Sequence, residues 1–340
     1  MLRINEGDYA YASARIRAKE PRLLGNSQFD RMLEASAAEE AYKVLTEAEY
    51  GIEGSGTTGS TTGLFAFEEL LSGEMKKCYM LLSEITPHQE VIKAFQRRHD
   101  YFNIKVLLKA EFSGAEVPRI LIDTGTIGIE EITRMIRERD YSELTPLMQE
   151  AITEVYDVFS RTQDPQAVDL ILDRAAYRQQ TMDLKAIDSP YLQGIAEIMT
   201  DITNIRMFVR ARLLNKAWDF VKKLLSGEGT ISEETFFKNS DKPAESFIEE
   251  IQHSRYGDAV SKGWELYRTK KSLSGLEKLL DDYLMHYVQS AKMVTMGVEP
   301  VVAYLFAKEA ELRNVRIIMT GKINRLPVDM IRERLREVYV

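Results

Sequence analysis

A short pattern occurs three times in this chain of 340 residues. An acidic residue is followed by two variable positions, an asparagine, a β-branched residue, a basic residue and an apolar residue. The three copies occupy residues 100–106, 201–207 and 311–317, and their asparagines lie 101 and 110 residues apart. Self-similarity at a fixed spacing is typical of proteins built from copies of one structural unit. The repeat therefore constrains the fold more than any other feature of the sequence.

Two further patterns accompany each copy in the same order. A leucine-rich segment comes first, at residues 23–25, 121–127 and 224–231, and a tyrosine followed by a small residue comes next, at Tyr50, Tyr141 and Tyr256. The constant order predicts three similar helical units, residues 1–116, 117–218 and 219–340. Repeated units that each need neighbours to bury their apolar faces pack together. We expect them to surround a pseudo-threefold axis and to leave a central opening.

Apolar residues follow a helical period throughout the sequence. Between residues 190 and 225 they are spaced three or four positions apart, and Thr86, Thr145, Asp164 and Ser189 each precede a proline, as N-caps do. We expect one helix over 190–225, another over 299–320 that ends at Gly321, and a last one over 327–338. Strand-like alternation bounded by hairpin turns is missing. The pattern predicts an all-α fold.

Composition excludes several classes of protein. A net charge of −8 disfavours a nucleic-acid partner, which needs an excess of lysine and arginine. The sequence contains neither an uncharged apolar run of bilayer length nor the apolar region of a signal peptide. With a single cysteine, Cys78, an internal disulfide is impossible. We therefore expect a cytoplasmic protein without a membrane span.

Motifs for catalysis or cofactor binding are also missing from the sequence. The four histidines lack the spacing of a zinc site, and no pair of carboxylates stands out as an acid–base couple. The segment Gly54–Gly63 resembles a phosphate-binding loop in its glycines, but Ser60 stands where such a loop has lysine. We interpret it as a surface loop. The prediction is a protein that is not an enzyme and has no cofactor or metal.

The repeated asparagines are the candidate site residues, with the basic residues that follow them. A mid-helix asparagine is disfavoured unless its side chain makes a specific hydrogen bond. Either the asparagines tie a neighbouring helix or turn, or they face the central opening and contact a partner. The basic residues form either a solvated, salt-bridged face or a surface for an acidic partner. The six positions are Asn103, Lys105, Asn204, Arg206, Asn314 and Arg316.

Longer segments resemble a known family. The opening residues 9–24, with 29–33 and 47–51, look like the start of the C subunit of the V/A-type ATPases, whose eukaryotic relative is the d subunit of the vacuolar enzyme. The segments 103–105, 204–207 and 309–316 look like later parts of that family. Because the matching segments come in the family's order, the resemblance covers essentially the whole chain.

The resemblance implies a definite function. Members of the family form a funnel of three similar helical domains on the cytoplasmic face of the membrane rotor ring. The funnel receives the foot of the central stalk and transmits torque, with no catalytic residue or cofactor of its own. The expected partners are central-stalk subunits and the cytoplasmic loops of the rotor ring, and the expected location is peripheral to the membrane. The alternative is a generic helical scaffold that binds soluble partners.

Overall fold

A computed structural model of the chain describes residues 1–48, 50, 64–227 and 229–340. The chain folds into two compact units. Unit 1 contains residues 1–4 and 88–250, and unit 2 contains residues 5–87 and 251–340. The segment Gly54–Gly63, which the sequence predicted to be a surface loop, lies outside the described residues.

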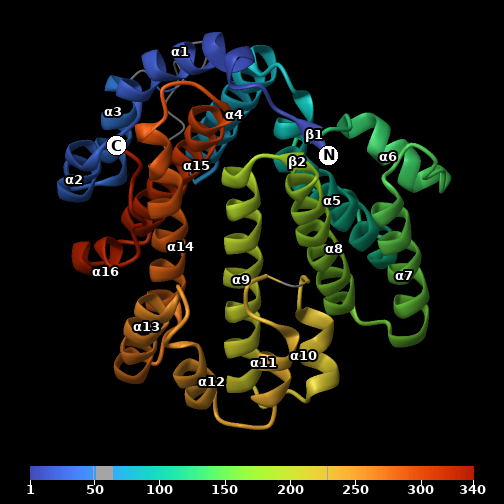
Figure 1. Cartoon of the computed structure of the whole chain (residues 1–340). Helices are drawn as coiled ribbons and strands as arrows, with labels where there is room; N and C mark the ends of the chain where they lie inside the picture. The colour runs from blue at the N-terminus through green and yellow to red at the C-terminus, as the bar shows by residue number, and fades with distance from the viewer. Residues whose placement is uncertain (49, 51–63, 228) are drawn as a thin grey trace. The chain divides into compact units, whose positions relative to one another are not determined.

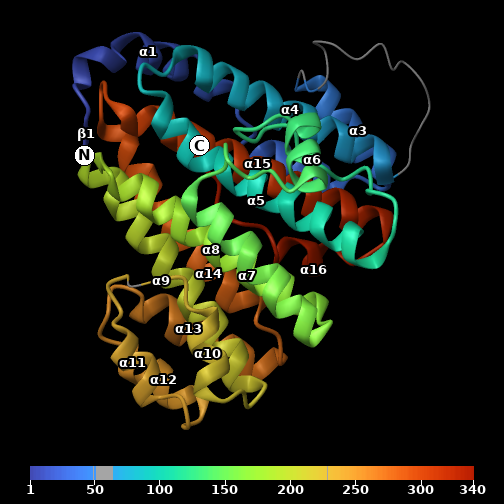
Figure 2. The same cartoon turned by 90° about the vertical axis from the view of Figure 1, so that its right-hand side faces the viewer.

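Unit 1 is built from helices apart from two short strands. Strands β1 (Leu2–Arg3) and β2 (Ile187–Asp188) pair in parallel over two residues each. The helices are α5 (Gln89–Ser113), α6 (Ile129–Glu138), α7 (Pro146–Thr162), α8 (Pro165–Lys185), α9 (Pro190–Leu213), α10 (Trp218–Leu224), α11 (Glu233–Lys238) and α12 (Ala244–Ile251), whose last residue begins unit 2. Helix α8 contacts α5, α7 and α9 (Figure 1), and α5, α7 and α8 run side by side in Figure 2.

The core of unit 1 follows from the helical period seen in the sequence. Apolar side chains of α5, α6, α7 and α8 form one buried cluster. Three predicted N-caps are confirmed, because the side chains of Thr145, Asp164 and Ser189 accept hydrogen bonds from backbone amides of α7, α8 and α9. Thr86 does not cap α5, which begins at Gln89 after His88. The prediction at Thr86 was wrong.

Unit 2 is organised around one long buried helix. Its helices are α1 (Ala10–Lys19), α2 (Asn26–Glu34), α3 (Ala38–Glu47), α4 (Leu64–Ile85), α13 (Gly257–Lys270), α14 (Ser274–Gln289), α15 (Val298–Ile323) and α16 (Val328–Arg332), with 3₁₀ turns at Glu6–Tyr9, Glu20–Arg22 and Ser290–Met293. Helix α15 contacts α1, α2, α3, α4 and α14. Because it is enclosed on so many sides, α15 is buried around most of its circumference.

Three expected helix boundaries differ from the structure. The helix expected over 190–225 divides into α9 and α10, since Asn215 has the left-handed φ of 51° that ends a helix. Gly321 does not end α15, which continues to Ile323. A Cβ on Gly321 would lie 2.6 Å from Ile331, so the glycine serves close packing. The helix expected over 327–338 ends at Arg332, and a turn at residues 333–334 and a segment without regular structure follow it.

The all-α prediction is confirmed, since strands account for only four of the described residues. None of the helices in the described ranges combines the length and the apolar character needed to cross a bilayer. The division into three units at 1–116, 117–218 and 219–340, and their arrangement about a pseudo-threefold axis, stay predictions.

Candidate functional site

The first repeated asparagine clamps the turn that follows its own helix. Asn103 lies on α5 and is fully buried. Its amide nitrogen donates to the backbone oxygen of Ile122 over 2.7 Å, and its amide oxygen accepts from the Ile122 backbone nitrogen over 2.8 Å. The side chain therefore replaces a peptide group and satisfies the backbone donor and acceptor of the half-buried Ile122.

The acidic residue one turn earlier holds the second half of the same turn. The Asp100 carboxylate accepts from the Thr126 amide over 3.1 Å, from the Thr126 hydroxyl over 2.6 Å and from the Ile127 amide over 3.2 Å. Burial raises the pKa of Asp100, while the bonds from Thr126 and Ile127 oppose that shift. Asp100 and Asn103 lie one helical turn apart, so together they form one clamp.

The second copy on α9 repeats this geometry. The Asp201 carboxylate accepts from the Thr230 amide over 3.0 Å, the Thr230 hydroxyl over 2.6 Å and the Ile231 amide over 3.1 Å. Asn204 accepts from the Ser226 amide over 2.9 Å and donates to the Gly227 oxygen over 2.9 Å. Two copies of the sequence pattern thus give two equivalent clamps in unit 1.

The third copy, on α15, keeps the asparagine and changes the acid. Asn314 bonds both backbone groups of one residue, donating to the Arg336 oxygen and accepting from the Arg336 amide, each over 2.8 Å. Glu311 stands in place of aspartate and accepts from the Leu24 backbone amide and the Tyr50 hydroxyl. The Lys308 ammonium lies 2.7 Å from Glu311, so this carboxylate also belongs to a buried ion pair.

The leucine-rich segments are the turns that the clamps hold. From the order of the patterns along the sequence, each leucine-rich segment was expected to belong to the same copy as the asparagine that comes after it. In the structure, the turn near Ile122 is bound by the preceding asparagine, Asn103, and the turn near Ser226 is bound by Asn204. The first leucine-rich segment is bound at Leu24 by Glu311, which belongs to the last copy of the pattern. The clamps therefore connect successive copies.

The repeated basic residues differ in their surroundings. Lys105 on α5 lies 2.6 Å from Asp173 on α8, and Arg316 on α15 lies 2.8 Å from Glu68 on α4. Arg206 is half-buried on α9. In the first and third copies the basic residue therefore joins two helices of its own unit, as in a salt-bridged face. The six candidate residues are distributed over three clamps rather than gathered in one site.

Sequence reasoning omitted the acidic residues from the candidate set. Asp100, Asp201 and Glu311 were visible as the first position of the repeated pattern, and they make most of the clamp contacts. The signal that could have identified them was their fixed position three residues before each asparagine. A carboxylate at that position on a helix lies on the same face as the asparagine.

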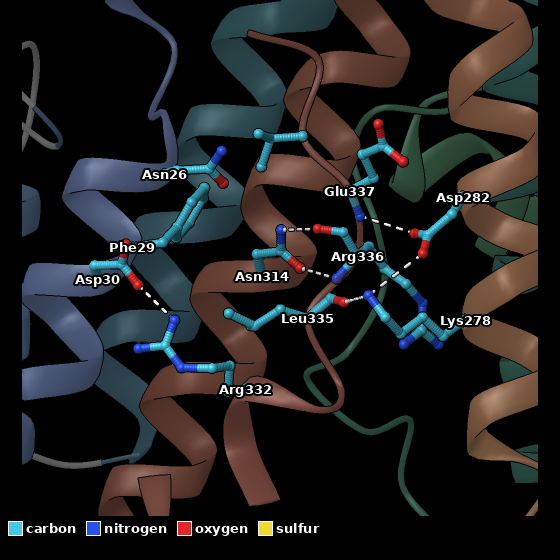
Figure 3. A pocket seen from close by; sticks show the side chains of 11 residues that line it. Asn26, Phe29, Asp30, Lys278, Asp282, Asn314, Arg332, Leu335, Arg336 and Glu337 are labelled. Carbon is cyan, nitrogen blue, oxygen red and sulfur yellow. Dashed lines mark hydrogen bonds and ion pairs between the residues drawn. The ribbon is translucent and has the colours of Figure 1, made fainter. Parts of the chain in front are cut away.

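A polar cavity of about 500 Å³ adjoins the third clamp. Figure 3 shows it between α2, α14, α15 and the carboxyl-terminal segment. Its charged side chains are engaged with one another, for Arg332 lies 2.6 Å from Asp30 and Lys278 lies 3.3 Å from Asp282. Elsewhere in the described chain, no group of three His, Cys, Asp or Glu side chains is arranged to hold a metal ion. The cavity is lined by structural ion pairs.

The family model for the ATP synthase (C/AC39) subunit matches residues 12–334. The chain belongs to this family. The resemblance seen in the sequence segments is thereby confirmed.

Relatives of this C/AC39 chain match nearly all of its length. The C subunit of the V-type sodium ATPase of Enterococcus hirae is 26% identical over 338 residues, which cover 98% of this chain and 99% of the relative. The C subunit of the A-type ATP synthase of Methanocaldococcus jannaschii is 24% identical, with 98% of this chain and 87% of the relative covered. The corresponding protein of Haloferax volcanii is 25% identical, with 96% of each chain covered.

The third clamp of this C/AC39 chain should respond to alkaline pH through Tyr50. Burial, reinforced by the Glu311 carboxylate, raises the pKa of Tyr50 well above its ordinary value of 10.0. In the unfolded state tyrosine loses its proton near pH 10, whereas folded Tyr50 keeps it. Stability therefore falls as the pH rises above 10, by about 1.4 kcal/mol at pH 11.

The Tyr50→Phe variant lacks this ionisation and should lose less stability between pH 8 and pH 11. Urea unfolding of both proteins at the two pH values measures the difference. Equal losses in the two proteins would show that Tyr50 is not held in its protonated form.

Proposed function

We propose that this chain is a non-catalytic rotor subunit of a V/A-type rotary ATPase or ATP synthase, and that it couples the central stalk to the membrane ion-translocating ring. The observation that carries the proposal is the family match over residues 12–334. It is supported by relatives of similar length that are C subunits of a V-type sodium ATPase and of A-type ATP synthases.

The clamps suit a part that transmits force. A subunit that transmits torque must resist deformation. Loops between helices are ordinarily the first parts of a protein to deform. In this chain, turns after α5 and α9 are fixed to those helices by buried side chains of Asn103 and Asn204. Each buried hydrogen bond costs about 1–3 kcal/mol to break without replacement. The clamps therefore oppose displacement of these turns from α5 and α9.

The proposal extends to shape, partners and location. The three helical units, residues 1–116, 117–218 and 219–340, form a funnel around a pseudo-threefold axis. The funnel contacts central-stalk subunits on one side and the cytoplasmic loops of the rotor ring on the other. The protein lies on the cytoplasmic face of the membrane as a peripheral part of the complex. It performs no chemistry and carries no cofactor.

Co-purification tests this proposal against the scaffold alternative. A tagged copy of the chain is isolated from native membranes in mild detergent, and its partners are identified by mass spectrometry. The proposal predicts both stalk and ring subunits among the partners, in fixed proportion to the chain. A tagged soluble protein from the same cells serves as the control. Recovery with soluble proteins only, and never with ring subunits, would support the generic scaffold instead.

A further inference from the structure

The turns held by the first two clamps are continuous pieces of chain. Asp100 and Asn103 bind backbone groups of Ile122, Thr126 and Ile127. Asp201 and Asn204 bind those of Ser226, Gly227, Thr230 and Ile231. Within each turn, the residue bound by asparagine and the residues bound by aspartate are separated by only a few positions. If one half of such a turn loosens, the short connecting chain keeps it near its clamp, which favours immediate rebinding.

The turn held by the third clamp is assembled from two segments that lie far apart in the sequence. Asn314 binds Arg336, near the carboxyl end, and Glu311 binds Leu24, near the amino end. Val340 lies next to Gly25, since a Cβ placed on Gly25 would be 3.8 Å from the Val340 side chain. Counting from the asparagine-bound residue, Val340 occupies the place that Thr126 and Thr230 occupy in the continuous turns. These two segments thus meet where each of the other turns is one continuous piece of chain.

We infer that residues 333–340 and 23–25 are two halves of one turn, and that their non-covalent junction is a clasp that opens while the rest of unit 2 stays folded. Opening separates the Arg336 side of the turn from the Leu24 side. No peptide bond connects the two sides locally, so neither keeps the other in place. The clasp is a conformational device that the continuous turns lack.

The contacts of the carboxyl-terminal segment fit a part that detaches. The Glu337 amide donates to Asp282 over 2.8 Å, and the Gln289 side chain donates to the Val338 oxygen over 2.9 Å. These contacts are polar and partly exposed, so water replaces them at low cost. The cavity of about 500 Å³ lies between this segment and α2 (Figure 3), which removes packing that would otherwise hold the segment down.

Other contacts of the carboxyl-terminal segment stabilise its closed position. Val338 and Tyr339 are buried, and the Arg336 guanidinium lies 2.7 Å from Asp281. Closing therefore buries apolar surface and forms an ion pair, while opening releases a short segment without regular structure and breaks no helix. Opening of the carboxyl-terminal segment therefore costs less free energy than global unfolding of the protein.

Native-state hydrogen exchange of the full chain tests the clasp, with the continuous turns as internal controls. The amides of Arg336 and Glu337 should exchange at least tenfold faster than those of Ile122, Thr126, Ser226 and Thr230, after correction for intrinsic rates. Their exchange should also depend little on low concentrations of denaturant, because local opening exposes little surface. Equal protection in all three turns, lost only with global unfolding, would overturn the inference.

A disulfide across the junction gives a second test. In the Gly25→Cys, Val340→Cys variant the two thiols lie close enough to pair after a small movement of the chain end, and Cys78 is buried. Oxidation should slow exchange of the Arg336 and Glu337 amides at least tenfold and leave the Ile122 amide unchanged. The reduced variant and the Val340→Cys single variant are the matched controls. An oxidised protein with unchanged Arg336 and Glu337 exchange would contradict the clasp.

Discussion

Replacing Glu311 by alanine should destabilise the protein by about 3–5 kcal/mol, because removal of one partner of a buried ion pair leaves the other charge uncompensated. The Glu311 side chain is 2% exposed, and that of its partner Lys308 is 9% exposed. The variant also leaves the Leu24 amide without its acceptor. Chemical denaturation, followed by circular dichroism, measures the loss.

A matched control for Glu311→Ala is Glu68→Ala. Glu68 also pairs with a basic residue of α15, Arg316, but its side chain is 41% exposed. Exposed ion pairs contribute about 0–1 kcal/mol, so this variant should stay close to the parent protein. If both variants lost the same stability, the buried cluster around Glu311 would have no special role.

Substitution of Gly125 or Gly229 by alanine should cost about 3 kcal/mol each, through overpacking and the loss of clamp hydrogen bonds. A Cβ on Gly125 would lie 2.1 Å from the Asp100 carboxylate, and a Cβ on Gly229 would lie 2.0 Å from that of Asp201. The carboxylates are fixed by three donors each, so they have no room to withdraw. Thermal and denaturant midpoints report the effect.

Gly25→Ala is the control for this pair of substitutions. Gly25 belongs to the third turn, but the nearest atom to its added Cβ is a Gln28 side-chain oxygen at 3.6 Å. That distance is ordinary van der Waals contact, so we expect a change below about 0.5 kcal/mol. A loss at Gly25 as large as at Gly125 would mean that the clamps are not the cause.

Local sequence signals predicted much of this structure. The apolar period identified the helices, the oxygen-bearing residues before Pro146, Pro165 and Pro190 identified three helix starts, and the repeat identified the buried asparagines. These features depend on residues within one or two helical turns of each other. Such local features can be recognised in a single sequence.

The remaining features depend on contacts that local spacing does not encode. The pairing of Glu311 with Leu24 joins residues 287 positions apart, and no local pattern indicates which turn a helix will bind. The glycine at 321 looks like a helix end, yet it lies inside α15 where Ile331 packs closely. The cluster of Lys308, Tyr50 and Glu311 likewise forms only when α15 meets the segment after α3. Tertiary packing decides these features.

The central claim is that this chain couples the central stalk to the membrane ion-translocating ring and performs no chemistry itself. Membrane vesicles that contain the complete complex are compared with vesicles from a strain that lacks this chain, and both ATP hydrolysis and ATP-driven ion uptake are measured. We expect the soluble head to hydrolyse ATP without the chain, while ion uptake is lost. Purified chain, or its Gly25→Ala variant, should restore uptake. A soluble head that cannot hydrolyse ATP without this chain would place it in the catalytic machinery and contradict the account.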